Sequence, residues 1–256
     1  MHVQAVIGVF LIILILLVVI RHSVKERFSQ KPNLVIITSV IHTIDAPLSY
    51  GKRSLMTHDQ RFQQTRYSIS SVRERIPNPY VVLIEGSDIT EEEAAEFMQM
   101  GCDQIHMVSD SVRKFINGPH KSVGEVKMLM DYLTTVDPDD YETISKISGR
   151  YYLTDNFDWD RKPIDAPLYS CEFNTHYNKE GEMLYNTRYY RFPMSDFHKY
   201  LNVLHSTLED PEFVNGIMDV EHYNIFKTFR DDNKTMKPEL IGVRGYVAPF
   251  GFEVED

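Results

Sequence analysis

Hydroxyl, acidic and basic side chains stand where predicted strands of this 256-residue chain end. Thr38 and Ser39 close the first strand, Glu85 closes the second, and Lys146 and Arg150 belong to the fourth and its following turn. In open parallel sheets, ligands bind beyond the carboxyl ends of the strands. A carboxylate buried there needs a partner, and basic side chains can neutralise a phosphate directly. We therefore expect the chemistry of the chain at this edge of the sheet.

An acidic pair follows the fourth predicted strand. Asp158 and Asp160 form an Asp-Trp-Asp sequence about eight residues after Arg150. Carboxylate oxygens are the ligands that hard divalent cations prefer, so the pair is a candidate metal site. The chain holds 37 acidic residues, and Asp-x-Asp arises in such a chain by chance. A solvated loop is the alternative interpretation of this segment.

The strands of the sheet are predicted from short aliphatic runs. These are Leu34–Ile41, Tyr80–Glu85, Gln104–Val108 and Thr143–Ser148. Continuous β-branched runs are typical of strands that are covered on both faces.

Capped helices separate these strands. Thr57 begins a capping box and an amphipathic stretch that runs to about Arg75, Thr90 caps a second helix, and Ser122 with Glu125 caps a third. Strands that alternate with helices predict βαβ units and a mainly parallel sheet. The predicted fold is α/β, a Rossmann-like three-layer α/β/α sandwich.

The second half of the chain, from residue 154, is less regular. Strands are predicted at 168–173, 184–192 and 241–248, and helices at 194–208 and 219–229. With no repeat and no low-complexity linker, we expect one continuous domain over residues 33–256 rather than a separate second lobe.

Several common nucleotide and hydrolase motifs are absent from the sequence. No Gly-x-Gly-x-x-Gly follows the first strand, and there is no Gly-x-x-x-x-Gly-Lys-Ser/Thr. These absences argue against a dinucleotide-binding site and a P-loop NTPase. Gly-x-Ser-x-Gly is missing as well, which argues against an α/β-hydrolase.

The layout resembles that of nucleotide-sugar-dependent glycosyltransferases of the GT-A type over about residues 32–250. Five segments carry the resemblance, namely LVIITSVI, VVLIEGS, SVGE, SKISGRYYL and MDVEH. It implies a nucleotide-binding half at 33–153 and an acceptor half at 154–256.

The resemblance also assigns roles to single residues. Thr38, Ser39 and Glu85 would contact the nucleoside of the donor. Glu221 would be the base that deprotonates the acceptor hydroxyl, with His222 beside it as a further catalytic candidate.

The departing diphosphate of a nucleotide-sugar needs positive charge beside it. In the GT-A family an Asp-x-Asp usually holds Mn²⁺ or Mg²⁺ there, and Asp158 and Asp160 would do so in this chain. The strand end itself carries Ser148-Gly149-Arg150 instead. Lys146 and Arg150 could neutralise the diphosphate directly, so metal-dependent and metal-independent chemistry both stay open.

Each candidate also has a purely structural interpretation. Arg150 could form a structural salt bridge, and Glu221 and His222 could cap the helix that follows them. Gly124 could admit a phosphate or serve helix packing. The arginines of helix 61–75 are expected to lie on a solvated face.

An apolar run opens the chain and predicts a membrane anchor. Val3–Ile20 contains no charge and is roughly 27 Å long as a helix, close to the thickness of a bilayer core. We assign residues 1–22 to a transmembrane signal-anchor and 23–32 to a basic juxtamembrane linker. Lys and Arg follow the run, which by the positive-inside rule places the soluble domain on the cytoplasmic side of a single-pass protein. A cleaved signal peptide is the alternative.

The amino-acid composition limits which classes of partner the protein can bind. The net charge is −10, which argues against a nucleic-acid binder. The two cysteines, Cys102 and Cys171, have no zinc-type spacing and are expected as buried thiols.

Two functions from different classes follow from these observations. The first is a membrane-anchored glycosyltransferase with a nucleotide-sugar donor and a glycan, lipid or protein acceptor. The alternative is a non-catalytic, membrane-anchored binding or structural protein with a transferase-like fold.

Overall fold

The computed structural model describes residues 31–48, 51–165, 168–169, 188–215, 241–247 and 250–255. The predicted anchor lies outside these residues, as do Cys171, Glu221 and His222 and the predicted helix 219–229. Within the described ranges no helix is both long and apolar enough to cross a bilayer. The anchor and the orientation of the protein therefore stay predictions.

A six-stranded sheet forms the centre of the molecule, in the order β3-β2-β1-β4-β7-β6. The first four of these strands run parallel, and β7 and β6 continue the sheet in antiparallel fashion. A second sheet has the order β5-β8-β9. The strands are β1 (Asn33–Ser39), β2 (Pro79–Glu85), β3 (Gln104–Met107), β4 (Thr143–Ser148), β5 (Tyr151–Leu153), β6 (Leu168–Tyr169), β7 (Tyr189–Pro193), β8 (Val243–Tyr246) and β9 (Glu253–Glu255).

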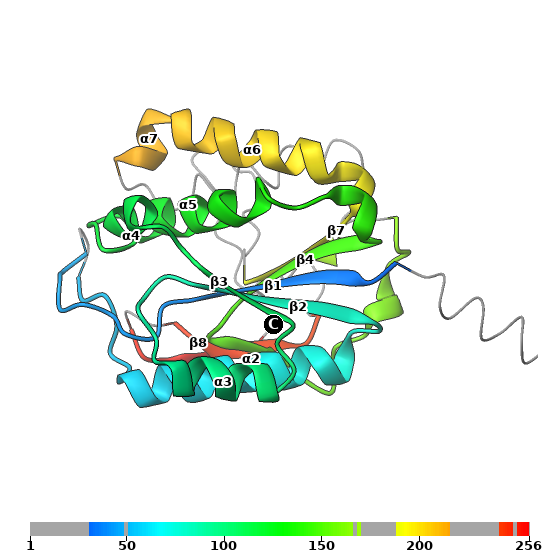
Figure 1. Ribbon diagram of the computed structural model, residues 1–256, viewed down its shortest axis with the longest axis horizontal. Coiled ribbons are helices and arrows are strands. Elements are labelled where there is room, and N and C mark those ends of the chain that lie inside the picture. The colour runs from blue at the N-terminus through cyan, green and yellow to red at the C-terminus, as the bar shows by residue number, and fades with distance from the viewer. Residues whose placement is uncertain are drawn as a thin grey trace, which may run out of the picture. The chain divides into compact units, whose positions relative to one another are not determined.

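Helices cover both faces of the six-stranded sheet (Figure 1). On one face lie α4 to α7, and on the other lie α2 and α3. This arrangement confirms a mixed α/β fold with a mainly parallel central sheet. The helices are α2 (His58–Arg75), α3 (Glu91–Gln99), α4 (Asp110–Ile116), α5 (Lys121–Leu133), α6 (Phe197–Glu209) and α7 (Pro211–Val214).

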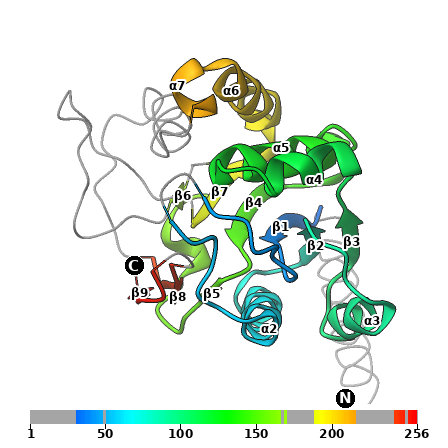
Figure 2. The same cartoon turned by 90° about the vertical axis from the view of Figure 1, so that its left-hand side faces the viewer.

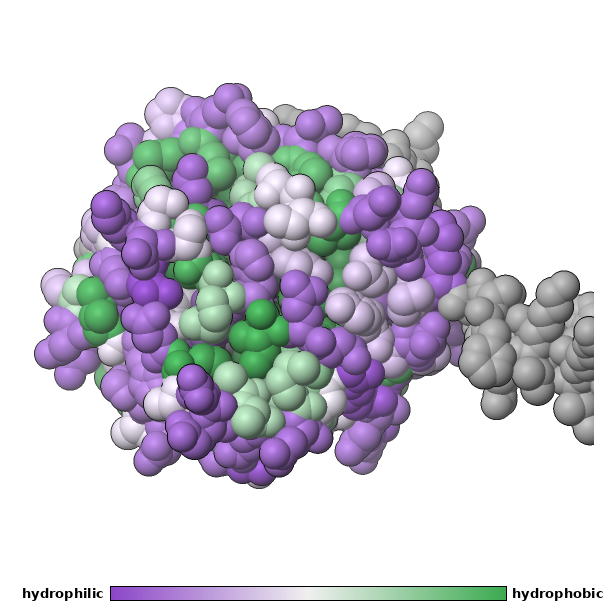
Figure 3. All heavy atoms as spheres, viewed as in Figure 1, coloured by the Kyte–Doolittle hydropathy of each residue, from purple (hydrophilic) through white to green (hydrophobic). Residues whose placement is uncertain are grey.

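The core lies in two layers, one on each side of the sheet. Alternate residues of β1 point to opposite layers: Leu34 and Ile36 pack with α5 and α6, and Val35 and Ile37 pack with α2 and β5. All four are fully buried, as expected for a strand covered on both faces. On the face seen in Figure 3, hydrophilic residues dominate and hydrophobic ones form smaller patches between them.

Two predicted capping boxes are confirmed. Thr57 caps α2 with Gln60, and Thr90 caps α3 with Glu93, each through reciprocal bonds between side chain and backbone. These boxes fix where both helices begin.

The predicted cap at Ser122 is wrong. The N-cap of α5 is His120, two residues earlier, so the helix begins at Lys121, and this cap makes no side-chain bond. A capping box would need the Glu125 carboxylate at the helix start, whereas Glu125 accepts a hydrogen bond from Thr38 of β1. The short helix α4, which precedes α5, was not predicted.

The second half of the chain adds strands to the same sheet. Of the predicted strands, 168–173 and 184–192 are described only as β6 and β7, and 241–248 as β8. The predicted helix 194–208 is confirmed as α6, preceded by a 3₁₀ turn, Met194–Asp196. The division into a nucleotide-binding and an acceptor half stays a prediction.

Candidate functional site

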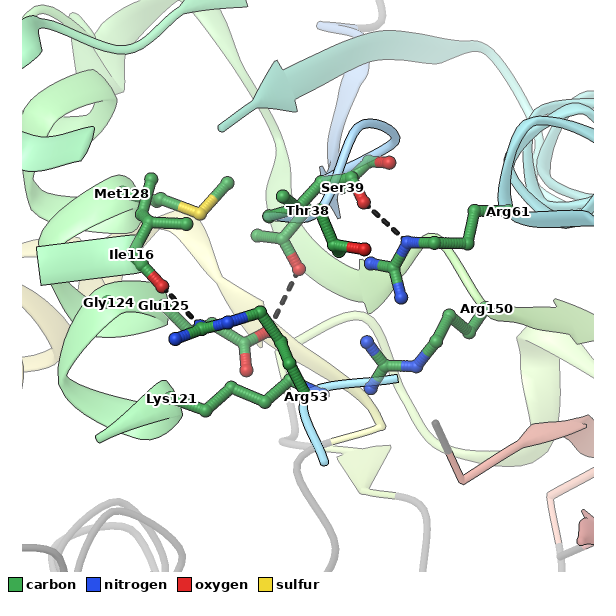
Figure 4. Close-up of a pocket in the computed structure, with 12 residues that line it drawn as sticks. Thr38, Ser39, Arg53, Arg61, Ile116, Lys121, Gly124, Glu125, Met128 and Arg150 are labelled. Carbon is green, nitrogen blue, oxygen red and sulfur yellow. Dashed lines mark hydrogen bonds between the residues drawn. The ribbon is translucent and has the colours of Figure 1, made fainter. Parts of the chain in front are cut away.

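A small pocket opens at the carboxyl ends of β1 and β4, the edge that faces the viewer in Figure 2. Its volume is about 50 Å³. Pockets for whole drug-sized ligands hold roughly 300–1,000 Å³, so this one suits a single small group such as a phosphate. The polar residues that line it are Thr38, Ser39, Thr43, Arg53, Arg61, Lys121, Glu125 and Arg150 (Figure 4).

Besides Arg53, three cationic side chains reach this pocket from different elements. Arg61 comes from the second turn of α2, Lys121 from the first residue of α5, and Arg150 from the turn after β4 (Figure 4). Burial, with Arg150 and Arg53 nearby, lowers the pKa of Arg61 to about 9, although Glu85 opposes the shift. Burial, Arg150 and Arg61 likewise lower the pKa of Lys121 well below its usual value. An anion among these groups would relieve their mutual repulsion.

The backbone around Arg150 is tightly fixed. Its carbonyl oxygen accepts a hydrogen bond from the Tyr246 N–H at 3.2 Å, and its Nε donates to the Tyr246 carbonyl at 3.4 Å. A Cβ atom on Gly245 would lie 2.1 Å from the Arg150 oxygen, and one on Gly149 would lie 3.0 Å from Thr65 Oγ1. Glycine is therefore required at 245 and favoured at 149, and the Arg150 guanidinium points into the pocket (Figure 4).

Glu125 is the acidic residue of the pocket. Its Oε1 accepts hydrogen bonds from Thr38 Oγ1 at 2.8 Å and Ser148 Oγ at 3.2 Å, and lies 2.6 Å from Lys146 Nζ. Burial alone would raise the pKa of Glu125, but Lys146 and Arg150 lower it to about 2. Glu125 is therefore ionised at neutral pH and a weak base.

Lys146 was predicted to face the ligand, and the structure places it behind Glu125. Its side chain is 1 % exposed and also donates to Ser148 Oγ at 3.0 Å. The ammonium holds the Glu125 carboxylate in place and does not itself line the pocket.

Arg53 ties the loop after β1 to the end of α4. Its two terminal nitrogens donate to the carbonyl oxygens of Ile116 and Gly118, both at 2.6 Å, and of Asn117 at 3.0 Å. The free carbonyls at a helix C-terminus carry partial negative charge, which favours a cation there. Arg53 thus forms one fixed wall of the pocket.

Glu85 lies fully buried beside the pocket without lining it. Its Oε1 accepts hydrogen bonds from the backbone N–H groups of Ile41 at 3.0 Å and Ser87 at 2.8 Å. Burial raises the pKa of this carboxyl despite these bonds. In the described part of the chain, the observed role of Glu85 is to hold the loops after β1 and β2 together.

Asp158 and Asp160 lie away from the pocket. Both are exposed, and the Asp158 side chain accepts a bond from the Asp160 N–H within a 3₁₀ turn, Trp159–Arg161. The chain reaches this turn because β5 runs back along α2, so that Asp155 contacts Arg75 at the far end of that helix from Arg61. Among the described residues no three His, Cys, Asp or Glu side chains are grouped to hold a metal ion. Neither Asp158 nor Asp160 lines the pocket, so a metal role of this pair at the pocket stays a prediction.

Of the predicted ligand-binding residues, Thr38, Ser39 and Arg150 meet in one pocket. Arg53, Lys121 and Glu125 were not predicted as pocket residues. Arg61 was expected on a solvated face, which is wrong, because it is 5 % exposed. A signal for Arg61 was present, because it stands four and eight residues before Thr65 and Ile69 on the buried side of α2. Gly124 serves helix packing, since a Cβ there would lie 2.7 Å from Ile116 Cα.

Comparison with known proteins does not identify the chain. No protein-family model matches it, and no curated protein matches its sequence. Its function therefore has to be argued from the pocket.

Proposed function

We propose that this protein is a membrane-anchored glycosyltransferase of GT-A-like architecture that uses a nucleotide-diphosphate sugar as its donor. One observation supports the proposal most: Arg61, Lys121 and Arg150 converge at the carboxyl edge of the sheet in a protein whose net charge is −10. Open α/β sheets bind ligands at this edge, and a local concentration of positive charge favours an anion.

In the proposed reaction the acceptor hydroxyl attacks the anomeric carbon of the donor sugar. The bond from this carbon to the diphosphate oxygen breaks, and its electron pair stays on the diphosphate. Arg61, Lys121 and Arg150 would stabilise that developing charge, since fixed positive groups in a pocket cost no reorganisation during the reaction.

The remaining roles follow the chemistry of the side chains. Within the described ranges three side chains donate to Glu125, all of them to Oε1, so Oε2 would accept a hydroxyl of the nucleotide-sugar. The proton of the acceptor hydroxyl would go to Glu221, with His222 beside it. A glycan, a lipid or a protein could supply the hydroxyl, and an anchor at 1–22 would keep the enzyme near membrane-borne acceptors.

A non-catalytic binding protein is the second candidate. The observation that favours it is that Glu125, the acidic residue that lines the described pocket, is engaged by Thr38, Ser148 and Lys146, and a carboxylate held in this way is a poor base.

Thermal unfolding with nucleotide-sugars tests the proposal. UDP-, GDP- and CMP-sugars are added at about 100 times their dissociation constant, where a ligand stabilises by roughly 2.7 kcal/mol. We expect the full stabilisation by a diphosphate donor in the wild type and only about 0.4–1.4 kcal/mol at the same concentration in Arg150→Ala, whose affinity should be 10- to 100-fold weaker. Arg66→Ala is the matched control, because Arg66 lies on α2 and pairs with Glu96.

Stabilisation without release of the nucleotide diphosphate in the presence of acceptors would favour the binding protein. The absence of stabilisation by any nucleotide-sugar would contradict the glycosyltransferase and favour the non-catalytic binding or structural protein.

A further inference from the structure

A larger groove lies on the other side of Arg150, which lines both cavities. Its volume is about 590 Å³, within the range of roughly 300–1,000 Å³ that is typical of ligand sites. One wall is α2, from which five side chains between Asp59 and Tyr67 line the groove. The other wall is the small sheet β5-β8-β9. The groove residues used below are Asp59, Gln60, Gln63, Gln64, Tyr67, Tyr152, Tyr246 and Glu253.

The amide of Gln64 points to a ligand. Its Oε1 is buried and has no hydrogen-bond partner in the described part of the protein. By contrast, the Oε1 atoms of Gln60 and Gln63 accept bonds from Thr57 N–H and Arg66. A buried amide oxygen without a donor is costly, so a ligand hydroxyl that donates to Gln64 after the amide turns into the groove is favoured.

The aromatic residues of the groove favour a ligand with apolar faces. Tyr67 and Tyr152 lie with their ring centroids 6.4 Å apart and their planes tilted by 46°. Tyr67 is 66 % exposed, and such an exposed ring is available for contact. A tyrosine presents an apolar body and a polar tip, which matches the C–H and hydroxyl groups of a sugar ring. The tilt leaves no parallel slot for a flat nucleobase between the two rings.

The groove differs from the cationic pocket in the charge of the side chains that line it. Asp59 and Glu253 line the groove, and Glu253 is held by Arg244 at 2.8 Å. Carboxylates repel phosphates and accept hydrogen bonds from hydroxyls. A neutral, hydroxyl-rich ligand therefore fits the groove better than a phosphate-bearing one.

We infer that the groove binds a neutral saccharide through Gln64, Tyr67 and Tyr152, with one end of the saccharide at Arg150. The further statement that this saccharide is the acceptor rests on the proposed function. In that reaction Arg150 would lie between the acceptor in the groove and the donor diphosphate in the pocket. A glycan acceptor is thereby favoured over a protein one.

Saturation-transfer NMR on the full chain tests the inference. The chain is kept in a detergent without a sugar headgroup, and maltotriose, cellotriose, mannotriose and N,N′,N″-triacetylchitotriose are added one at a time without nucleotide. We expect transfer to at least one of them. Its affinity should fall about five- to tenfold in Gln64→Ala, the loss for one neutral hydrogen bond.

Variants keep this test specific. Tyr67→Ala should weaken binding, Tyr67→Phe should retain most of it, and Gln99→Ala, on the exposed side of α3, should leave it unchanged. The inference is overturned if none of the trisaccharides shows transfer, if both alanine variants in the groove bind as the wild type does, or if uridine or guanosine displaces the saccharide.

The failures of the two proposals can be told apart. Nucleotide-dependent stabilisation without saccharide binding would contradict the saccharide groove and still support the donor pocket. Saccharide binding without any response to nucleotides would support the groove and contradict the donor pocket.

Discussion

At the scale of single residues, the pocket concentrates positive charge that the protein as a whole lacks. Arg61 and Lys121 both have lowered pKa values because burial and neighbouring cations disfavour their charged forms. Such strained electrostatics is common where a ligand supplies the missing counter-charge. Arg150 is the most direct residue to test, since its Nε donates only a long hydrogen bond, 3.4 Å, to the Tyr246 carbonyl within the described part of the chain.

Replacement of Arg150 by alanine should weaken binding of UDP or GDP by about 10- to 100-fold, because a charge-assisted hydrogen bond contributes roughly 1.5–3 kcal/mol. Isothermal titration measures the affinity, and circular dichroism checks that the variant folds. Equal affinities of Arg150→Ala and the wild type would contradict the assigned pocket.

Binding of a diphosphate should be linked to the protonation of Lys121. The pKa of the free Lys121 is lowered, and a bound anion favours the ammonium, so binding takes up a proton. The affinity should therefore fall as pH rises from this lowered pKa towards 10.5, the ordinary value for lysine. Titrations in buffers of different ionisation enthalpy detect the uptake. In Lys121→Arg the side chain stays charged and only the contribution of Arg61 remains, so proton uptake equal to that of the wild type would contradict the assignment.

Replacing Glu125 and replacing Lys146 should lower the free energy of unfolding by different amounts. Lys146 is 1 % exposed, whereas Glu125 is 23 % exposed. Glu125→Gln deprives a buried ammonium of this carboxylate and should cost roughly 3–5 kcal/mol, more than Lys146→Met does. Urea unfolding measures both, together with the double variant, which should lose less than the sum of the two. Additive losses would show that the pair does not interact.

At the scale of elements, the loop after β1 depends on Arg53. Three carbonyls at the end of α4 accept hydrogen bonds from this side chain. Arg53→Ala should lower the free energy of unfolding by about 2–4 kcal/mol and speed amide exchange between residues 42 and 56. Arg53→Lys should lose the same stability, because an ammonium lacks the forked geometry with which the guanidinium reaches all three carbonyls. Exchange unchanged from the wild type would contradict this role.

Local signals predicted many elements correctly. β1, β2, β4 and the caps of α2 and α3 follow from short runs and capping boxes. The predicted start of α5 was wrong because Glu125 does not cap the helix. It accepts a hydrogen bond from Thr38, which lies 87 residues away in the sequence, and no local pattern reveals such a contact.

The candidate site was predictable only in part for the same reason. Thr38, Ser39 and Arg150 follow from the rule that ligands bind at strand ends. Lys121 reaches the pocket because α5 packs closely on α4, and Asp158 and Asp160 leave it because β5 turns back along α2. Both facts depend on tertiary contacts rather than on sequence spacing.

At the scale of the whole molecule, the sheet brings distant parts of the chain to one edge. β1 lies between β2 and β4, so residues after the first and fourth strands become neighbours. The α/β fold class and the parallel strands were predicted from alternating elements, whereas the order of β7 and β6 was not.

The predicted anchor can be tested on the intact chain. We expect the full-length protein to remain with lipid vesicles after alkaline carbonate washing, and a variant that lacks residues 1–22 to be released, since about 20 apolar residues span a bilayer. Full release of the intact chain would contradict the anchor.

The central claim is that basic side chains, and not a metal held by Asp158 and Asp160, neutralise a diphosphate at the sheet edge. Titration of the full-length chain with UDP and GDP, in EDTA and again with Mn²⁺, tests it most directly. We predict that one of the two nucleotides binds in EDTA with an affinity within about threefold of that with Mn²⁺, a difference of roughly 0.7 kcal/mol. Binding that requires Mn²⁺ and is lost in Asp158→Asn, or no binding under either condition, would contradict the account.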